Sequence, residues 1–198
     1  MATALLSRMA ETAVDTAGLS PAISGAERWY AVYTRSNCEF KVSRHLSTRG
    51  LVEFLPVYKS RRQWSDRSRE LDLPLFAGYV FCRFDPHRAV PVVSTPGVVR
   101  VIGSGRTAVP IADSEIDAIR AICTSGVRAQ PWPFLEVGRR VAIVNGPLTG
   151  IEGIVVELKN QFRLVVSVSL LQRSVAAEIE REWIQPLSFA ASANGVQQ

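Results

Sequence analysis

The stretch that most constrains the fold is residues 75–84, LFAGYVFCRF, where eight consecutive apolar residues follow Pro74. An apolar run of this length, rich in aromatic residues, is typical of a β-strand that is buried on both faces. Side chains alternate along a strand, so the run divides into two faces. One face is predicted to carry Phe76, Gly78, Val80, Cys82 and Phe84, and the other Leu75, Ala77, Tyr79, Phe81 and Arg83. We therefore expect a separate cover over each face, supplied by this chain or by a partner.

Around this run, residues 28–126 predict one α/β domain. The aromatic and branched stretch 28–35, RWYAVYTR, predicts the first strand, and Ser36 with Glu39 has the spacing of a capping box that begins a helix. Further strand and helix patterns follow in alternation. Their order predicts a mostly antiparallel sheet with the helices on one face, an α/β sandwich whose other face is left without a cover from its own domain.

A basic hairpin is predicted at residues 59–70, KSRRQWSDRSRE, with its turn near Asp66 to Ser68. Basic residues interleaved with an aromatic one are typical of a surface that contacts nucleic acid, although a solvated charged hairpin explains the same pattern. The candidate nucleic-acid-binding residues of this hairpin are Arg61, Arg62, Trp64, Arg67 and Arg69.

From residue 127 the pattern changes. Residues 127–135 contain two prolines and little periodicity, which predicts a linker. Residues 136–188 predict a small five-stranded β-barrel, because short strand patterns alternate with turn residues, so the whole chain is expected to be α+β. The barrel strands are predicted at 139–144, 151–159, 162–169, 172–179 and 182–186. The polar ends, 1–27 and 189–198, are expected to be a disordered leader and a flexible tail.

Composition argues against several classes of function. The 198 residues carry a net charge of +5 with a pI near 9.5, which is compatible with a nucleic-acid partner without requiring one. Three cysteines without a CxxC pair and only two histidines do not supply a zinc site, and they predict a reducing, cytoplasmic compartment. No run reaches the ~20 apolar residues of a membrane span. Cys38 and His45 would lie two helical turns apart, which is too far for a catalytic pair, so we expect no enzyme. We also expect no metal and no cofactor.

Four segments, taken in order, resemble the NusG family of transcription elongation factors. They are WYAVY at 29–33; FAGYVF at 76–81; PGVV at 96–99 with Pro110-Ile111 and the helix after it; and a KOW motif from Val137 to Val155. The resemblance covers roughly 28–187 and implies an N-terminal polymerase-binding domain followed by a KOW domain. The basic hairpin, LPLF at 73–76 and LLQRSV at 170–175 look most like the specialised antiterminator paralogues that act on particular operons.

The resemblance also implies roles for particular residues. The sheet face without helices would bind the clamp helices of the largest subunit of RNA polymerase, and rigid aromatic side chains with a polar tip suit such an interface. The residues that match this site are Tyr33, Phe76, Ala77, Gly78, Tyr79 and Phe81. The alternative is that these aromatics are plain core, and strand parity sends Phe76 to the opposite face. Arg35 and the basic hairpin would approach non-template or upstream DNA in the elongation complex, or else are solvated arginines.

In the barrel, Leu148, Ile151 and Leu171 match positions where family members show apolar side chains to the small ribosomal subunit or to Rho. The alternative is that they form the barrel core. Glycines and valines disfavour helix, so the barrel is expected to remain β rather than refold. The stretch around Val90 to Val92 is shorter than the run with which a specialised paralogue touches the polymerase gate loop, and Pro96 replaces a DNA-reading arginine, so neither contact is implied.

The predicted function is therefore a non-catalytic elongation or antitermination factor, a monomer without membrane contact. Its N-terminal domain would bind polymerase and suppress pausing or termination, while the tethered barrel recruits a second partner at high effective concentration. The alternative is a ribosome-associated RNA-binding KOW protein. Against that alternative, the six basic residues of 136–187 are offset by six acidic ones.

Overall fold

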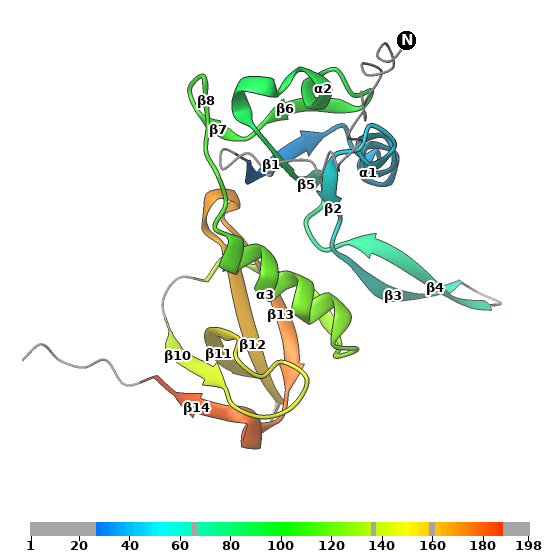
Figure 1. Ribbon diagram of the computed structural model, residues 1–198. Coiled ribbons are helices and arrows are strands. Elements are labelled where there is room, and N and C mark those ends of the chain that lie inside the picture. Colours follow the sequence, from blue (N-terminus) through cyan, green and yellow to red (C-terminus); the bar gives the residue numbers. More distant parts are fainter. Residues whose placement is uncertain (1–26, 65–66, 136–137, 159–160, 188–198) are drawn as a thin grey trace, which may run out of the picture.

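The computed structural model describes residues 27–64, 67–135, 138–158 and 161–187, and only the backbone of 61–64 and 67–69. The chain combines an N-terminal part, built on a four-stranded sheet with helices, and a C-terminal part built on a six-stranded sheet (Figure 1). The expected α+β class is confirmed. The predicted leader and tail lie outside the described residues, apart from Glu27. Within the described ranges, no helix is both long enough and apolar enough to span a membrane.

The N-terminal sheet is antiparallel, with strand order β2-β5-β1-β6. Its strands are β1 (Arg28–Thr34), β2 (Val52–Phe54), β5 (Tyr79–Phe84) and β6 (Val98–Val101). The aromatic and branched residues of β1 suit a central strand that is buried on both faces, and only its first residue and Tyr33 are exposed. In the register of β1 with β5, Ala31 lies opposite Phe81 and Tyr33 lies opposite Tyr79.

Helices cover both faces of this sheet, so the prediction that they share one face was wrong. The helices are α1 (Glu39–Thr48), α2 (Val90–Val93) and α3 (Asp113–Thr124). The face with α1 and α2 is packed by Tyr30, Val32, Val42, Leu46, Val80, Cys82, Phe84 and Val92. The second face and α3 share a core that includes Trp29, Ala31, Phe81, Ile116, Ile119 and Ile122. The regularly spaced isoleucines give α3 an apolar stripe of its own, which it buries on the second face.

The apolar run at 75–84 is part turn and part strand. Residues 75–78 form a turn, and β5 begins only at Tyr79. This turn breaks the strand alternation, so Phe76 does not lie on the α1 face as parity predicted. Phe76 instead packs edge-on against Phe81, with ring centroids 5.4 Å apart, in the core beneath the second face.

Two hairpins extend the N-terminal part. The larger, β3 (Val57–Trp64) with β4 (Arg67–Pro74), runs away from the sheet in Figure 1. Its turn was predicted too far along the chain, because Arg67 and Ser68 already belong to β4 and pair with Trp64 and Gln63. The smaller consists of β7 (Gly103–Ser104) and β8 (Thr107–Ala108), and a single 3₁₀ turn, η1 (Pro86–Arg88), follows β5.

The C-terminal sheet, called the barrel from here on, has strand order β14-β10-β11-β12-β13-β9. Its elements are β9 (Ala129–Pro133), β10 (Arg139–Ile143), β11 (Glu152–Leu158), β12 (Gln161–Val168), η2 (Ser169–Leu171), β13 (Arg173–Ile179), η3 (Arg181–Trp183) and β14 (Ile184–Pro186). Five of the strands lie where the sequence predicts them. The sixth, β9, corrects the expected linker 127–135, because its residues pair with β13. The two prolines are tolerated there because β9 lies at an end of the sheet order, where a missing N–H donor leaves no neighbour unpaired.

Candidate functional site

The residues predicted to bind a partner come together, but at two depths. Tyr33 and Tyr79 lie opposite one another on β1 and β5, with ring centroids 5.4 Å apart. Tyr33 is 37% exposed, Ala77 is exposed, and Gly78 and Tyr79 are half-buried. We call these four residues the aromatic patch. Phe76 and Phe81 are fully buried beneath it and act as its support rather than its surface.

A tight turn fixes the shape of the aromatic patch. Gly78 has φ +86°, a conformation that side-chain-bearing residues rarely adopt. A Cβ added to Gly78 would lie 3.3 Å from Cε2 of Tyr33. The carbonyl of Gly78 accepts a hydrogen bond from the Thr34 N–H at 2.9 Å, and the Tyr79 N–H donates to the Phe76 carbonyl at 3.0 Å. Glycine is thus favoured by the backbone angle, and a side chain there would also crowd the Tyr33 ring.

Glu39 contributes to this turn, which the sequence did not predict. The expected capping box does not form: Ser36 and Asn37 make a turn, and Cys38 is the N-cap of α1. Glu39 is only 6% exposed, and its Oε1 accepts a hydrogen bond from the Gly78 N–H at 2.7 Å. Glu39 was predicted to cap its own helix, but its carboxylate instead holds a turn 39 residues away.

The barrel covers the face that was expected to lack an intramolecular cover. Arg173 of β13 places its guanidinium carbon 5.4 Å from the ring centroid of Tyr79, and its Nη1 donates to the Ala77 carbonyl at 3.5 Å. Glu115 of α3 accepts hydrogen bonds at its Oε1 from Ser169, at 3.2 Å from Oγ and 3.5 Å from the backbone N–H. One apolar cluster runs from the N-terminal sheet through α3 into the barrel, and Figure 1 shows α3 between them. Arg173 and Glu115 were missed because each meets a partner far away in the sequence.

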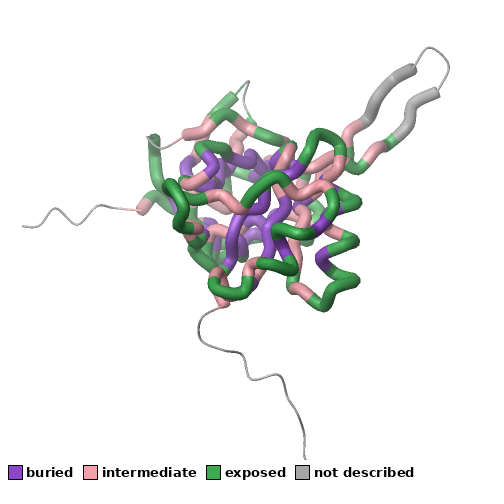
Figure 2. The backbone as a smooth tube through the Cα atoms, turned by 90° about the horizontal axis from the view of Figure 1, so that it is seen from above, coloured by how far each residue is buried: buried purple, intermediate pink, exposed green. Residues whose placement is uncertain are grey.

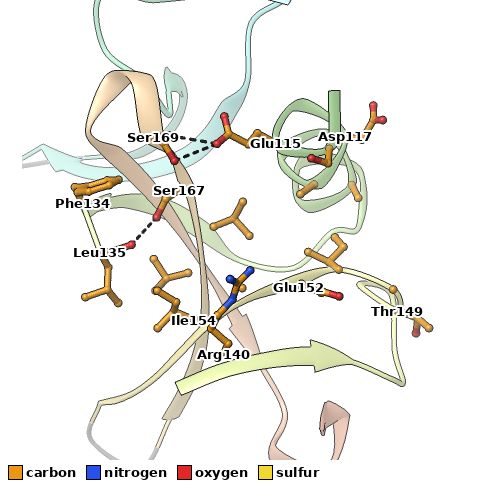
Figure 3. Close-up of a pocket in the computed structure, with 18 residues that line it drawn as sticks. Glu115, Asp117, Phe134, Leu135, Arg140, Thr149, Glu152, Ile154, Ser167 and Ser169 are labelled. Carbon is orange, nitrogen blue, oxygen red and sulfur yellow. Dashed lines mark hydrogen bonds between the residues drawn. The ribbon is translucent and has the colours of Figure 1, made fainter. Parts of the chain in front are cut away.

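The contact between α3 and the barrel is incompletely packed. It leaves a cavity of about 800 Å³ that is partly open to solvent (Figure 3). Charged and polar side chains line it, among them Glu115, Asp117, Arg140, Thr149, Glu152 and Ser169. In Figure 3, the Glu115–Ser169 hydrogen bonds lie at one side of this space, and Arg140 and Glu152 at another. Seen from above, the buried residues gather in the middle of the molecule (Figure 2). Side chains that line this cavity do not pack directly against the opposite part of the chain, which weakens the docking of the barrel.

The candidate nucleic-acid residues are placed unequally. Arg35 is exposed one residue beyond β1, where its N–H donates to the Gly97 carbonyl. Arg100, which the sequence analysis did not single out, lies opposite Tyr33 in β6, with its guanidinium carbon 5.9 Å from the Tyr33 ring centroid. The hairpin residues Arg61, Arg62, Trp64, Arg67 and Arg69 lie on paired strands, and their side chains are outside what the structure describes.

The three predicted partner-binding residues of the barrel are buried. Leu148, Ile151 and Leu171 are each no more than 9% exposed and belong to the main core cluster. The loop that carries Leu148 and Ile151 folds back on β10, because Ile143 exchanges hydrogen bonds with Gly150 and Ile151. The expectation that these side chains are presented to a partner is therefore not met in this conformation, and the core alternative describes them.

No metal-binding constellation accompanies the aromatic patch in the described part of the chain. Groups of three or more His, Cys, Asp or Glu residues that could hold a metal do not occur there. Burial, with Glu53 as a smaller cause, raises the pKa of the Cys82 thiol to about 12, and burial also raises the pKa of Cys123. Thiols with raised pKa values are poor nucleophiles at neutral pH. The site offers recognition chemistry: aromatic rings, a carbonyl and neighbouring arginines.

Comparison with known proteins identifies the family of this chain. Residues 27–120 match the family model NusG, described as transcription termination factor nusG. The transcription termination/antitermination protein NusG of Pseudomonas aeruginosa is 30% identical over 169 residues, covering 78% of this chain and 96% of that protein. The NusG of Staphylococcus carnosus is 29% identical over 179 residues, covering 82% and 97%. A solved structure of a domain interaction in Thermotoga maritima NusG has the same fold, with a TM-score of 0.51, 21% identity, and coverage of 82% and 98%. The chain therefore belongs to the NusG family.

Proposed function

We propose that this protein is a transcription factor that acts in termination or antitermination by binding RNA polymerase through the aromatic patch. The relatives named above are transcription termination/antitermination proteins. The observation that carries the proposal is the Tyr33–Tyr79 pair, two tyrosines on neighbouring strands whose rings pack at a tilt of 50° beside a buried apolar core. The polymerase surface that this patch would receive is the pair of clamp helices of the largest subunit.

The physical properties of the patch suit a helical partner. Tyrosines bury large area at low entropic cost, and their hydroxyls can remain hydrogen-bonded at the rim of an interface. Phe76 and Phe81 are rigid support because both are fully buried and pack edge-on. Gly78 has no side chain, so the Tyr33 ring packs directly over its backbone. A partner helix would thus meet a preformed surface, which lowers the ordering cost of binding.

The barrel and the polymerase would compete for this surface. Arg173 lies over Tyr79, so polymerase cannot reach that ring until the barrel moves away. The docked contact is suited to release, because it contains a cavity and its polar bonds are 3.2–3.5 Å long. The released barrel would then recruit a second partner, the small ribosomal subunit or Rho, while tethered to the elongation complex. Ile151 lines the cavity, so undocking would uncover it, whereas Leu148 would need its loop to move.

Arginines beside the aromatic patch would contact the DNA of the elongation complex. Arg35 and Arg100 are both exposed near Tyr33, and guanidinium groups pair with phosphates and stack on unpaired bases. Arg61, Arg62, Trp64, Arg67 and Arg69 of the hairpin would add contacts to upstream DNA. These contacts would steady the transcription bubble and suppress pausing, in a mechanism without covalent chemistry.

The deciding experiment measures binding of the full chain to bacterial core RNA polymerase by biolayer interferometry. Tyr79→Ala is expected to lower the affinity at least about tenfold, because an interface anchor is worth more than 1.4 kcal/mol. Phe40→Ala is the matched control, since Phe40 is an aromatic residue on α1 that is 48% exposed and outside the patch. Each variant is also measured with Arg173→Gln, so that docking of the barrel does not mask the effect. Equal affinities for the Tyr79 and Phe40 variants in both backgrounds would reject the patch as the polymerase site.

Occupancy on elongating polymerase across the genome separates two versions of this function. A general factor would follow polymerase on most transcription units. The specialised-paralogue prediction requires enrichment on one or a few long operons, and uniform occupancy would rule it out.

A further inference from the structure

We propose that Glu39 is a positioning residue for the aromatic patch, and that it acts by orienting the Ala77–Gly78 peptide. This inference rests on the proposed function only for its consequence in polymerase binding. Its structural content is independent of any partner. Glu39 is 6% exposed, so its side chain is not available as a surface contact. Its carboxylate accepts a 2.7 Å hydrogen bond at Oε1 from the Gly78 N–H.

The geometry of the peptide unit gives this hydrogen bond its effect. The bond between Ala77 and Gly78 is trans, as are all peptide bonds described here. In a trans peptide the N–H and the C=O point in opposite directions within one plane. Because Glu39 holds the N–H toward α1, the Ala77 carbonyl is turned away from α1, and it meets Nη1 of Arg173. A buried side chain on one face of the sheet therefore controls an acceptor on the other.

Besides Glu39, this peptide is held by the 3.5 Å contact from Arg173 to the Ala77 carbonyl, and the backbone hydrogen bonds of the turn do not fix it. Thr34 donates to the carbonyl of Gly78, which belongs to the following peptide unit, and the Tyr79 N–H also belongs to that unit. Gly78 has no Cβ, so its φ is free to change when the Glu39 contact is lost. Rotation of the Ala77–Gly78 peptide would withdraw the Ala77 carbonyl from the patch surface. It would also disturb the packing of Gly78 under the Tyr33 ring, which a Cβ would approach to 3.3 Å.

Sequence position alone explains neither the burial of Glu39 nor its partner. A glutamate in the first turn of a helix is ordinarily solvated and interacts with the helix dipole. Here the side chain is buried and crosses to a segment outside its own helix. Leaving the partly buried Gly78 N–H without an acceptor would cost free energy, which makes the contact a constraint on the turn.

Three variants of the full chain test the role of Glu39. Glu39→Met keeps most of the side-chain volume and removes the acceptor, whereas Glu39→Gln keeps an acceptor oxygen. Ser43→Ala is the matched control, because Ser43 also lies on α1 and its Oγ donates a 2.6 Å hydrogen bond, to Glu53 rather than to the turn. Thermal unfolding shows whether each variant folds, and the Ser43 variant gives the effect of losing a polar contact of α1 elsewhere.

The decisive readout is hydrogen exchange of the Gly78 amide, measured by NMR on the free protein. Glu39→Met is expected to speed this exchange by about tenfold or more relative to Ser43→Ala, and Glu39→Gln to restore most of the protection. Polymerase affinity is expected to fall most in Glu39→Met, less in Glu39→Gln and least in Ser43→Ala. Equal Gly78 exchange in the Met and Ala variants would overturn the proposal. So would faster Gly78 exchange without weaker polymerase binding, if Tyr79→Ala does weaken binding.

The two proposals can fail separately. If Tyr79→Ala leaves polymerase binding unchanged, the proposed function of the patch is wrong. The orientation of the Ala77–Gly78 peptide by Glu39 is then decided by the exchange measurement alone.

Discussion

Arg173 of the barrel lies over the ring of Tyr79 in the N-terminal sheet, with 5.4 Å between the guanidinium carbon and the ring centroid. Tyr79 packs against Tyr33. The guanidinium carbon of Arg100 lies over the Tyr33 ring, 5.9 Å from its centroid. Two tyrosines are thus bracketed by two arginines, one from each part of the chain. This relationship joins the candidate binding surface to the element that covers it.

Replacing Arg173 with glutamine is expected to favour the undocked form. The variant loses the contact with Tyr79 and the donor to the Ala77 carbonyl, and because Arg173 is exposed we expect a shift of about two- to fivefold in the docking equilibrium. NMR relaxation measures it, since the barrel and the N-terminal part tumble more independently when they separate.

Arg181→Gln is the matched control for this shift. Arg181 is exposed on the barrel and lies 6.0 Å from the ring centroid of Phe162, so its loss removes a similar contact that does not bridge the two parts. Identical tumbling of the two variants would show that the Arg173 contact does not hold the barrel.

Stability is expected to fall at alkaline pH because of Cys82. Burial raises the pKa of this thiol in the folded protein from 9.0 to about 12. Between these values the unfolded chain releases the proton and the folded chain retains it, so the folded state binds more protons and loses stability as pH rises. The contribution is complete below pH about 9 and declines by at most about 1.4 kcal/mol per pH unit up to about 12.

Denaturant unfolding at a series of alkaline pH values measures this slope. Cys82→Ala lowers stability at every pH by removing buried atoms, but it is expected to flatten the pH dependence. The raised pKa of Cys123 leaves a residual slope in the variant. A slope that is equal in the variant and the parent would contradict the assignment to Cys82.

Much of the fold could be predicted because it depends on local alternation. The strands β1, β5 and β10 to β14 were recognised from apolar patterns and turn residues, whereas the pairing of Tyr33 with Tyr79 is seen only in the structure. The errors arose where a distant partner decided the outcome. Glu39 has the spacing of a capping residue, and the sequence does not show that its hydrogen-bond donor is the distant Gly78 N–H. The prolines of β9 suggested a linker, because the pairing of β9 with β13 exists only in the folded chain. The second face looked uncovered because the cover is split between α3 and the barrel.

The support beneath the aromatic patch is expected to carry a large share of stability. Phe81→Ala should lower the free energy of unfolding by about 3–5 kcal/mol, because it removes a fully buried ring that packs against Phe76. Phe40→Ala makes the same chemical change at a residue that is 48% exposed and should cost no more than about 0.5 kcal/mol. Urea unfolding of both variants tests this difference. A loss at Phe81 as small as that at Phe40 would mean that the second face is not a packed core.

Substitutions of Leu148 and Leu158 test whether Leu148 belongs to the barrel core or to a binding surface. Leu148 is 1% exposed in the fold-back loop after β10, whereas Leu158 is 43% exposed near the end of β11. Leu148→Ala is expected to lower the free energy of unfolding by about 2–5 kcal/mol, and Leu158→Ala by less than about 0.5. If Leu148 instead serves a ribosomal or Rho partner from an exposed position, its variant will keep full stability in urea and lose binding to that partner. Because the loop is tied to Ile143 by two backbone hydrogen bonds, of 2.8 and 2.9 Å, we expect the stability loss.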